Sequence, residues 1–143
     1  MARNCRFAVA VHVCAVLTLR REDPPATSDW IAKSVNTNPV VVRRLLSALG
    51  KAGLVQSQRG ISGGSTLARD PAAITLLEIS RAVDADEGPP LPQQEPNPAC
   101  PVGANIRPIL TDILGRAEAA RERELHGITL ADIAAAIRAR QDL

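Results

Sequence analysis

Hydrophobic residues recur at helical spacing along the first part of the chain. The pattern predicts a helix over residues 5–19, because its apolar positions return at intervals of three and four. The two prolines of the following segment, EDPPATS, cannot continue a helix and therefore end it. A second, shorter helix is expected after this segment, capped by Thr27 or Ser28 and ending near Asn36.

The third predicted helix has one apolar face and one basic face. Asn38 followed by Pro39 is a start signal, and the pattern continues to about residue 52. Four residues at helical spacing are expected to be buried: Val42, Leu45, Leu46 and Leu49. The opposite face carries Val40, Arg43, Arg44, Ser47 and Lys51. Solvated helix faces usually mix acids and bases, so a face with three bases and no acid favours nucleic-acid binding over simple solubility.

A short β-hairpin is expected after this helix. Gly53 is placed to end the helix, LVQSQ reads as a strand and STLA as the returning strand. The turn between them, RGISGG, combines one arginine with three glycines, which allow positive φ and close approach of the backbone. Two short helices joined by three residues and followed by a hairpin predict a winged helix-turn-helix. In that fold Arg59 is placed to enter a narrow minor groove or to pair with a phosphate.

A nucleotide-binding loop is the alternative interpretation of this glycine-rich turn. Such loops carry G-x-x-x-x-G-K-[ST], or G-x-G-x-x-G between a strand and a helix of a parallel sheet. The chain has neither motif and no pattern of parallel strands. The hairpin is therefore favoured as a DNA-reading wing.

The C-terminal part of the chain follows a proline-rich segment. After a helix over residues 75–83, residues 85–99 contain five prolines and predict a loop or linker. Beyond it, apolar residues step by four and three, which is typical of a helix that pairs with a second copy. The residues expected at this dimer interface are Ile106, Ile109, Leu110, Ile113, Leu114 and Ala117. Pro108 either starts this helix or kinks it, and a capping box of Thr129 and Asp132 starts a last helix.

Length and charge agree with one small DNA-binding unit. The 143 residues suffice for one domain with appendages. We expect a mainly α fold with a small β-hairpin wing: a winged helix-turn-helix DNA-binding domain at 1–84, a proline-rich linker at 85–99 and dimerisation helices at 100–143. No acidic residue lies between Asp29 and Asp70, whereas six basic residues do, a distribution that favours a polyanionic partner. Only two aromatic residues are present, which argues against a single-strand binder built on base stacking.

Several classes of protein are disfavoured. No apolar run approaches the roughly 18 residues of a membrane span, and no signal peptide begins the chain, so a cytoplasmic protein without membrane contact is expected. Cys5, Cys14 and Cys100 are odd in number and unpatterned, and neither histidine has a metal-spaced partner, so no metal site is expected. No arrangement of carboxylates, or of a nucleophile with a base, indicates an enzyme.

The segment IAKSVNTNPVVVRRLLSALGKAGLVQSQRGISGGSTLARDPAAITLLEISRAVD, followed by CPVGANI and ITLADI, resembles the IscR/NsrR/CymR-type (Rrf-type) winged-helix bacterial repressors. The resemblance covers nearly the whole chain, and its most specific part is L..AGLV.S.RG..GG..LA....IT. It implies a homodimeric transcriptional regulator, usually a repressor, that binds a palindromic operator in double-stranded DNA. The residues that it places on DNA are Asn38, Val40, Val41, Arg43, Arg44, Ser47, Ser57, Arg59 and Gly60.

The physical roles of these residues follow from groove chemistry. Arg43 or Arg44 can pair bidentately with guanine, and Val40 or Val41 can contact a thymine methyl group. Asn38 and Ser57 can hold phosphates. The sequence does not decide which of the two arginines reads a base.

Two departures from the family pattern bear on effectors. Cluster-binding members carry three cysteines between the winged domain and the long helix, whereas this chain has Cys100 alone there, so neither an iron–sulfur cluster nor another cofactor is expected. Cys5 and Cys14 belong to the first predicted helix and are expected to be small buried hydrophobic residues. The family's usual tyrosine after the two glycines is Ser65 here, which weakens the expected packing of the wing.

Cys100 also remains a candidate sensor. It stands near a helix N-terminus, where a thiolate is stabilised, so it is either a redox sensor or an inert loop cysteine. The alternative function is a winged-helix module that binds a small-molecule effector or acts through a partner enzyme.

Overall fold

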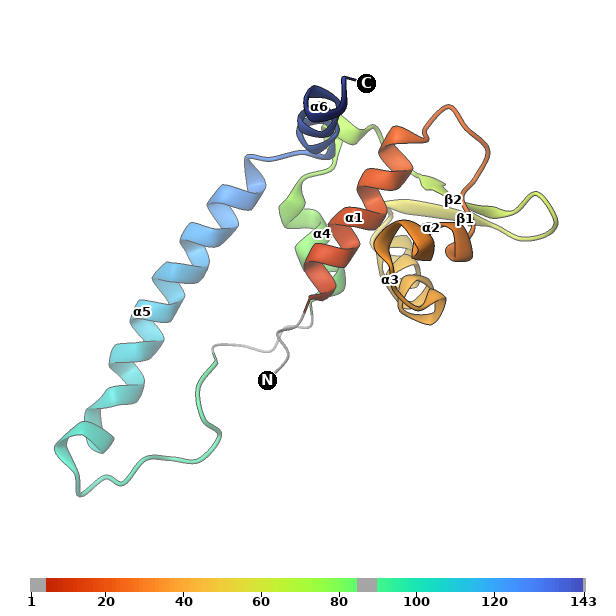
Figure 1. The fold of residues 1–143 in the computed structure, drawn as a ribbon. Coiled ribbons are helices and arrows are strands. Elements are labelled where there is room, and N and C mark those ends of the chain that lie inside the picture. The colour runs from red at the N-terminus through yellow and green to blue at the C-terminus, as the bar shows by residue number, and fades with distance from the viewer. Residues whose placement is uncertain (1–4, 85–89, 143) are drawn as a thin grey trace.

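The computed structural model describes residues 5–84 and 90–142, which form a mainly helical molecule with one β-hairpin (Figure 1). The elements are α1 (Arg6–Leu19), α2 (Ser28–Val35), α3 (Pro39–Lys51), β1 (Val55–Gln58), β2 (Gly64–Leu67), the 3-10 turn η1 (Pro71–Ala73), α4 (Leu76–Val83), α5 (Pro101–His126) and α6 (Leu130–Gln141). The expected winged helix-turn-helix is therefore present, with a long C-terminal helix after it. The part of the proline-rich segment at residues 85–89 lies outside the described residues.

Side-chain caps start α2, α3 and α6 where the sequence placed them. The Thr27 side chain accepts a hydrogen bond from the backbone N–H of Trp30, so threonine rather than Ser28 caps α2. Asn38 caps α3 through a 2.8 Å bond from the N–H of Val40. Thr129 and Asp132 form the complete capping box of α6. Each cap satisfies N–H groups that have no partner within the helix.

The core lies where α3 packs against α1, α2 and α4. The four predicted apolar positions of α3 are all buried, between 0 and 6% exposed. They join residues from α1, α2 and α4 in one cluster, together with Leu130 of α6. Burial of this stripe turns the other face of α3 outward. The helical periodicity therefore predicted both faces correctly.

The hairpin is joined to the segment before α2. Its strands pair antiparallel with Val55 opposite Leu67 and Gln58 opposite Gly64. Ser65 is buried and exchanges two backbone hydrogen bonds with Ala26, of 3.1 and 2.8 Å. Gly64 makes this approach feasible, since its φ is +152° and a Cβ there would lie 2.6 Å from the carbonyl oxygen of Ala26. The small residue that replaces the family's tyrosine thus holds the wing through its backbone.

Three local details differ from the sequence expectations. The turn η1 was not expected, and Asp70 caps it by accepting a hydrogen bond from Ala72. Helix α3 ends with Ala52 as its C-cap, so Gly53, at φ +77°, stands one position beyond the place predicted for it. Helix α5 begins at Pro101, so the idea that Pro108 starts it is wrong. A proline at the first helical position is itself a start signal, and Pro108 lies inside the helix.

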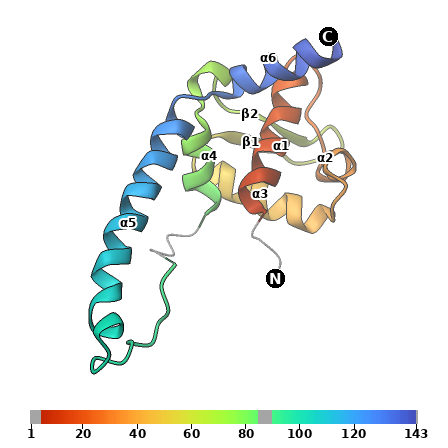
Figure 2. The same cartoon turned by 60° about the vertical axis from the view of Figure 1, so that its left-hand side comes forward.

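Helix α5 stands apart from the rest of the molecule, which we call the body: α1 to α4, the hairpin and α6. In Figures 1 and 2 the start of α5 extends well beyond the body, and only its end approaches α4. Helix α6 then crosses the end of α1. Between α5 and α6, Ile128 accepts a 2.9 Å hydrogen bond from Leu76, and Ile74 accepts one of 3.0 Å from Leu130. This short pairing fixes the end of α5 to the start of α4.

Candidate nucleic-acid interface

The outward side of α3 forms a continuous polar and basic surface. We call this surface, made of Val40, Arg43, Arg44, Ser47 and Lys51, the recognition face; all five side chains are exposed. Val41 flanks it and is also exposed, as is Asn38 at the start of the helix. The predicted contact residues of α3 therefore share one side of one rigid element. An exposed valine pair beside arginines is suited to thymine methyl groups next to polar base edges.

The two arginines of the recognition face have different surroundings. Arg43 faces α2, and its Nη2 lies 3.8 Å from the Oδ1 of Asp29. Arg44 makes no ion pair with any residue that the structure describes. Sequence reasoning missed this difference, because the pairing joins residues of two helices and leaves no mark on the periodicity of either.

The wing presents its arginine near the turn between β1 and β2. Ser57, Arg59 and Gly60 are exposed, and Gly60 adopts φ +103°, a conformation that favours glycine. The Ser57 hydroxyl is 3.1 Å from the Ser65 hydroxyl, so it is already engaged within the hairpin. At the tip, Ile61 is fully exposed. Sequence reasoning did not select Ile61, although it is the single apolar residue of the turn.

Helix α3 and the wing lie on the side of the molecule away from α5 (Figure 1). The structure thus collects the predicted contact residues at 38–47 and 57–60 on two neighbouring elements. The predicted dimer residues belong to a separate element. The molecule therefore presents a basic surface on α3 and the wing and a separate apolar surface on α5.

The predicted dimer residues of α5 form an apolar seam that none of the described residues buries. The α5 seam consists of Ile106, Ile109, Leu110, Ile113, Leu114 and Ala117. Ile109 and Ile113 are 53% and 45% exposed, and no residue of α5 is buried. A helix with apolar residues along one side needs another surface to cover them.

Arg121 joins α5 to the body. Its guanidinium donates to the Ser80 hydroxyl at 3.1 Å, lies 3.8 Å from Asp84, and stacks 5.5 Å from the centre of the Phe7 ring. A second pair, Arg81 with Glu122 at 3.5 Å, crosses the same boundary. We call these contacts between α5 and the body the Arg121 joint. They were not predicted, since the residues involved come from α1, α4 and α5, which are far apart in the sequence.

The described cysteines differ in environment. Cys100 is exposed at the N-cap position of α5, where the nearby backbone N–H groups of Gly103 and Val102 lower the pKa of its thiol. Cys14 is buried in the core, and burial raises the pKa of its thiol to about 12. The prediction that Cys14 is a buried hydrophobe is confirmed. Cys5, by contrast, is exposed at the start of α1, so its predicted burial is wrong.

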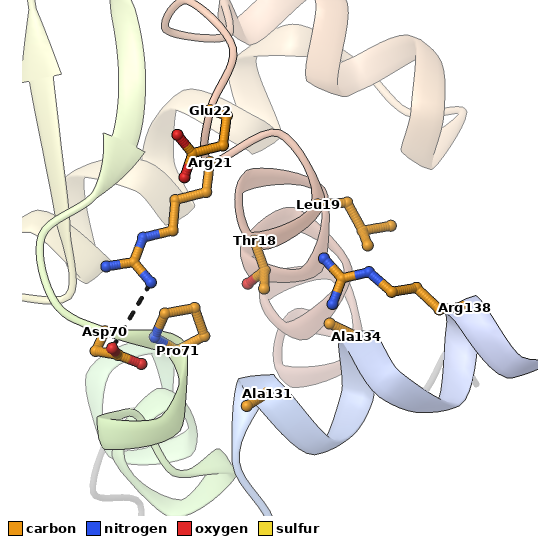
Figure 3. Close-up of a pocket in the computed structure, with 9 residues that line it drawn as sticks. All are labelled: Thr18, Leu19, Arg21, Glu22, Asp70, Pro71, Ala131, Ala134 and Arg138. Carbon is orange, nitrogen blue, oxygen red and sulfur yellow. Dashed lines mark ion pairs between the residues drawn. The ribbon is translucent and has the colours of Figure 1, made fainter. Parts of the chain in front are cut away.

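A cavity of about 310 Å³ lies where the end of α1, η1 and one side of α6 meet (Figure 3). Arg21 and Asp70 form a 3.8 Å ion pair on one wall, and Arg138 turns from α6 toward Thr18. Ala131 and Ala134 leave room beside them. The cavity is therefore charged and separate from the recognition face.

Within residues 5–84 and 90–142, no three His, Cys, Asp or Glu side chains come together in a way that could hold a metal ion. No described helix is long and apolar enough to cross a bilayer.

The buried back of α3, its exposed basic front and the adjoining hairpin define the class of winged helix-turn-helix proteins. Residues 3–136 match the Rrf2 family, described as iron-dependent transcriptional regulators, and the chain belongs to this family. This confirms the resemblance found in the sequence. The described residues do not fit the iron of that description, because they lack the ligand group that an iron site needs.

Similar proteins agree with this assignment. YwnA of Bacillus subtilis (strain 168), named as an HTH-type transcriptional regulator, is 43% identical over 130 residues, which are 91% of this chain and 95% of YwnA. A crystal structure described as a DNA-binding protein is 39% identical with a TM-score of 0.71, covering 90% of this chain and 97% of that one. The structure of CymR, the cysteine regulator of B. subtilis, has 25% identity and a TM-score of 0.66, covering 94% and 97%.

Proposed function

We propose that this protein is a dimeric, sequence-specific DNA-binding transcriptional regulator that acts as a repressor at a palindromic operator. The observation that carries the proposal is the recognition face of α3 beside the wing. Three of its five side chains are basic, and residues 30–69 contain no acid. Membership of a family of transcriptional regulators supports the same conclusion. An enzymatic role is not part of the proposal.

On this proposal α3 enters the major groove. Arg43 and Arg44 supply a base contact and a phosphate contact, Val40 and Val41 meet thymine methyl groups, and Ser47 lies toward the base edges. Asn38 and Ser57 contact phosphates at either end. The wing places Arg59 in the adjacent minor groove, where Gly60 allows the backbone to approach closely.

We further propose that two chains pair through the α5 seam. The support is the row of exposed isoleucines on a helix that buries none of its residues against its own body. The chain then divides into a winged domain at residues 1–84, a linker at 85–99 and dimerisation helices at 100–143. A two-fold dimer reads two half-sites about one helical turn apart, which is why the operator is palindromic.

The proposed effector input is redox chemistry at Cys100, without an iron–sulfur cluster. Its lowered pKa and exposure support a reactive thiolate. Oxidation by a peroxide would convert the thiolate to a sulfenic acid at the start of α5 and alter the dimer geometry. Operator affinity of the wild type before and after peroxide treatment tests this, with Cys100→Ser as the control. An unchanged affinity in the oxidised wild type contradicts the thiol sensor.

The main proposal is tested by selecting bound sequences from random DNA at two salt concentrations. The wild type should recover a palindrome with half-sites about one turn apart. Arg59→Ala should relax the preference at the minor-groove positions, and Arg43→Ala with Arg44→Ala should lose operator affinity and reduce the salt dependence. Weak, sequence-independent binding by all three proteins would contradict an operator-binding function.

A second candidate function is sensing of a small molecule or partner enzyme, favoured by the charged cavity between α1, η1 and α6. Its volume is at the lower end of the range for ligand sites. Thermal shift in the presence of small carboxylates tests it, since Arg138 is the cation placed to bind them. Arg138→Ala should abolish any shift, whereas Arg140→Ala, on the same helix but outside the lining, should not.

A further inference from the structure

Asp29 occupies an unusual place for an acid. It is the last acidic residue before the acid-free segment 30–69, and it lies in the first turn of α2, next to the recognition face. A carboxylate there repels the phosphates that the neighbouring arginines attract. The favourable interaction of a carboxylate with a helix N-terminus explains why an acid is tolerated at this position. It does not explain which residue the carboxylate pairs with.

Its partner is Arg43. The Oδ1 of Asp29 and the Nη2 of Arg43 are 3.8 Å apart, and both side chains remain more than half exposed on the same side as the recognition face. The one close contact between the two groups involves the terminal nitrogen Nη2 of the guanidinium. Arg44, the neighbour on α3, makes no such pair with any described residue.

We infer that Asp29 is a specificity-determining residue that positions Arg43 to read guanine and leaves Arg44 to contact phosphate. This inference rests on the proposed function. A guanidinium whose plane is restrained can meet the O6 and N7 of guanine with two parallel hydrogen bonds, and it loses them when the base is changed. A mobile arginine instead contacts whichever phosphate is nearby, and it contributes affinity without discriminating between base sequences.

Asp29 also opposes non-specific binding. Part of the Arg43 charge is neutralised by the pair, and the carboxylate itself is repelled by the backbone of any DNA. At the operator, the bidentate contact with guanine offsets this loss of binding free energy. Random DNA offers no such contact. The pair therefore increases the difference in affinity between operator and random DNA, because it weakens binding to random DNA.

The experiment compares base preference, affinity for random DNA and salt dependence in the wild type, Asp29→Ala, Arg43→Ala, Arg44→Ala and the Asp29→Ala/Arg43→Ala double variant. Asp29→Ala should lower the preference for guanine at one position of each half-site by about fivefold or more. It should also bind random DNA at least as tightly as the wild type, with a salt slope steeper by about one. Arg44→Ala should weaken all sequences alike and reduce that slope by about one.

Two controls separate positioning from other effects. Asp23→Ala removes an exposed carboxylate paired with Arg20 at 3.7 Å, before α2 and outside the recognition face, and should keep the wild-type preference. Asp29→Asn removes the charge while keeping a polar side chain at the start of α2, and should lose the preference as Asp29→Ala does. In the Arg43→Ala background, removing Asp29 should cause no further loss, because it acts through that arginine.

The outcomes that overturn the inference are distinct. If Asp29→Ala binds all sequences more tightly by one common factor, Asp29 is a repulsive charge and nothing more. An additive loss in the double variant shows that it acts without Arg43. If the wild type itself has no base preference, the proposed function fails and the inference fails with it; an altered preference in Arg43→Ala alone leaves the function standing and removes only the role of Asp29.

Discussion

The body and helix α5 differ in whether the chain itself buries their apolar residues. The body buries apolar residues from α1, α2, α3, α4, the hairpin and α6 in one cluster, whereas α5 contributes no buried residue despite being the longest described helix. Both regions carry apolar residues at helical spacing. Periodicity therefore predicts a helix with an apolar side, but only the fold shows whether the chain itself covers that side.

The largest expected effect comes from the core. Leu49 on α3 is completely buried, so Leu49→Ala leaves a cavity and should lower the free energy of unfolding by about 2–5 kcal/mol. Denaturant titration followed by circular dichroism measures this loss. Val102→Ala removes an apolar residue of α5 that is 65% exposed, and should change the free energy of unfolding by less than about 0.5 kcal/mol. Equal losses of unfolding free energy in the two variants would contradict the difference in burial between the body and α5.

The next effect concerns assembly rather than folding. Ile109→Asp together with Ile113→Asp places two charges on the α5 seam and should halve the mass found by sedimentation. The circular dichroism of the body should persist, since neither side chain is buried in it. Thr111→Asp, an exposed position outside the seam, is the matched control and should keep the wild-type mass. A wild type that already sediments as a single chain contradicts the seam as a dimer interface.

A smaller effect is expected where the two regions meet. Arg121→Ala removes the contacts with Ser80, Asp84 and the Phe7 ring, which together connect α5 to the body. Because these contacts are partly exposed, the free energy of unfolding should fall by only about 1 kcal/mol or less. The spacing tolerated between half-sites should broaden, as measured with operators lengthened or shortened by one base pair. Unchanged spacing selectivity would mean that other contacts set the angle of α5.

The smallest effect concerns Cys100. Its folded-state pKa is lowered by the N–H groups of Gly103 and Val102, so folding favours the thiolate. The stabilisation is therefore present at pH values above the pKa of the unfolded chain and is lost as the pH falls through the folded pKa. Cys100→Ser should remove this pH dependence from the unfolding curves. Iodoacetamide should modify Cys100 in the native protein well before the buried Cys14, and a reversed order would contradict the assignment.

Local signals made much of this fold predictable. Four features could be predicted because each depends on residues within a few positions of one another. They are the apolar stripe of α3, the Asn38 cap, the capping box at Thr129 and the hairpin with its glycine turn. Contacts between distant segments were not. The pairing of Asp29 with Arg43, the bridge of Ala26 with Ser65 and the Arg121 joint unite separate elements, which residue spacing does not encode. For α5 the sequence left two alternatives open at Pro108, and only the one in which the helix starts there was wrong, because α5 begins at Pro101 and continues through Pro108.

If two chains pair through α5 as proposed, its exposure also sets how the regulator responds to its own abundance. On the proposed pairing through the α5 seam, the concentration of dimers rises with the square of the chain concentration at low copy number. Sites on DNA then stay empty until the pool of chains passes a threshold, and fill steeply above it. A modest change in synthesis or degradation would thus act as a switch, with no ligand required.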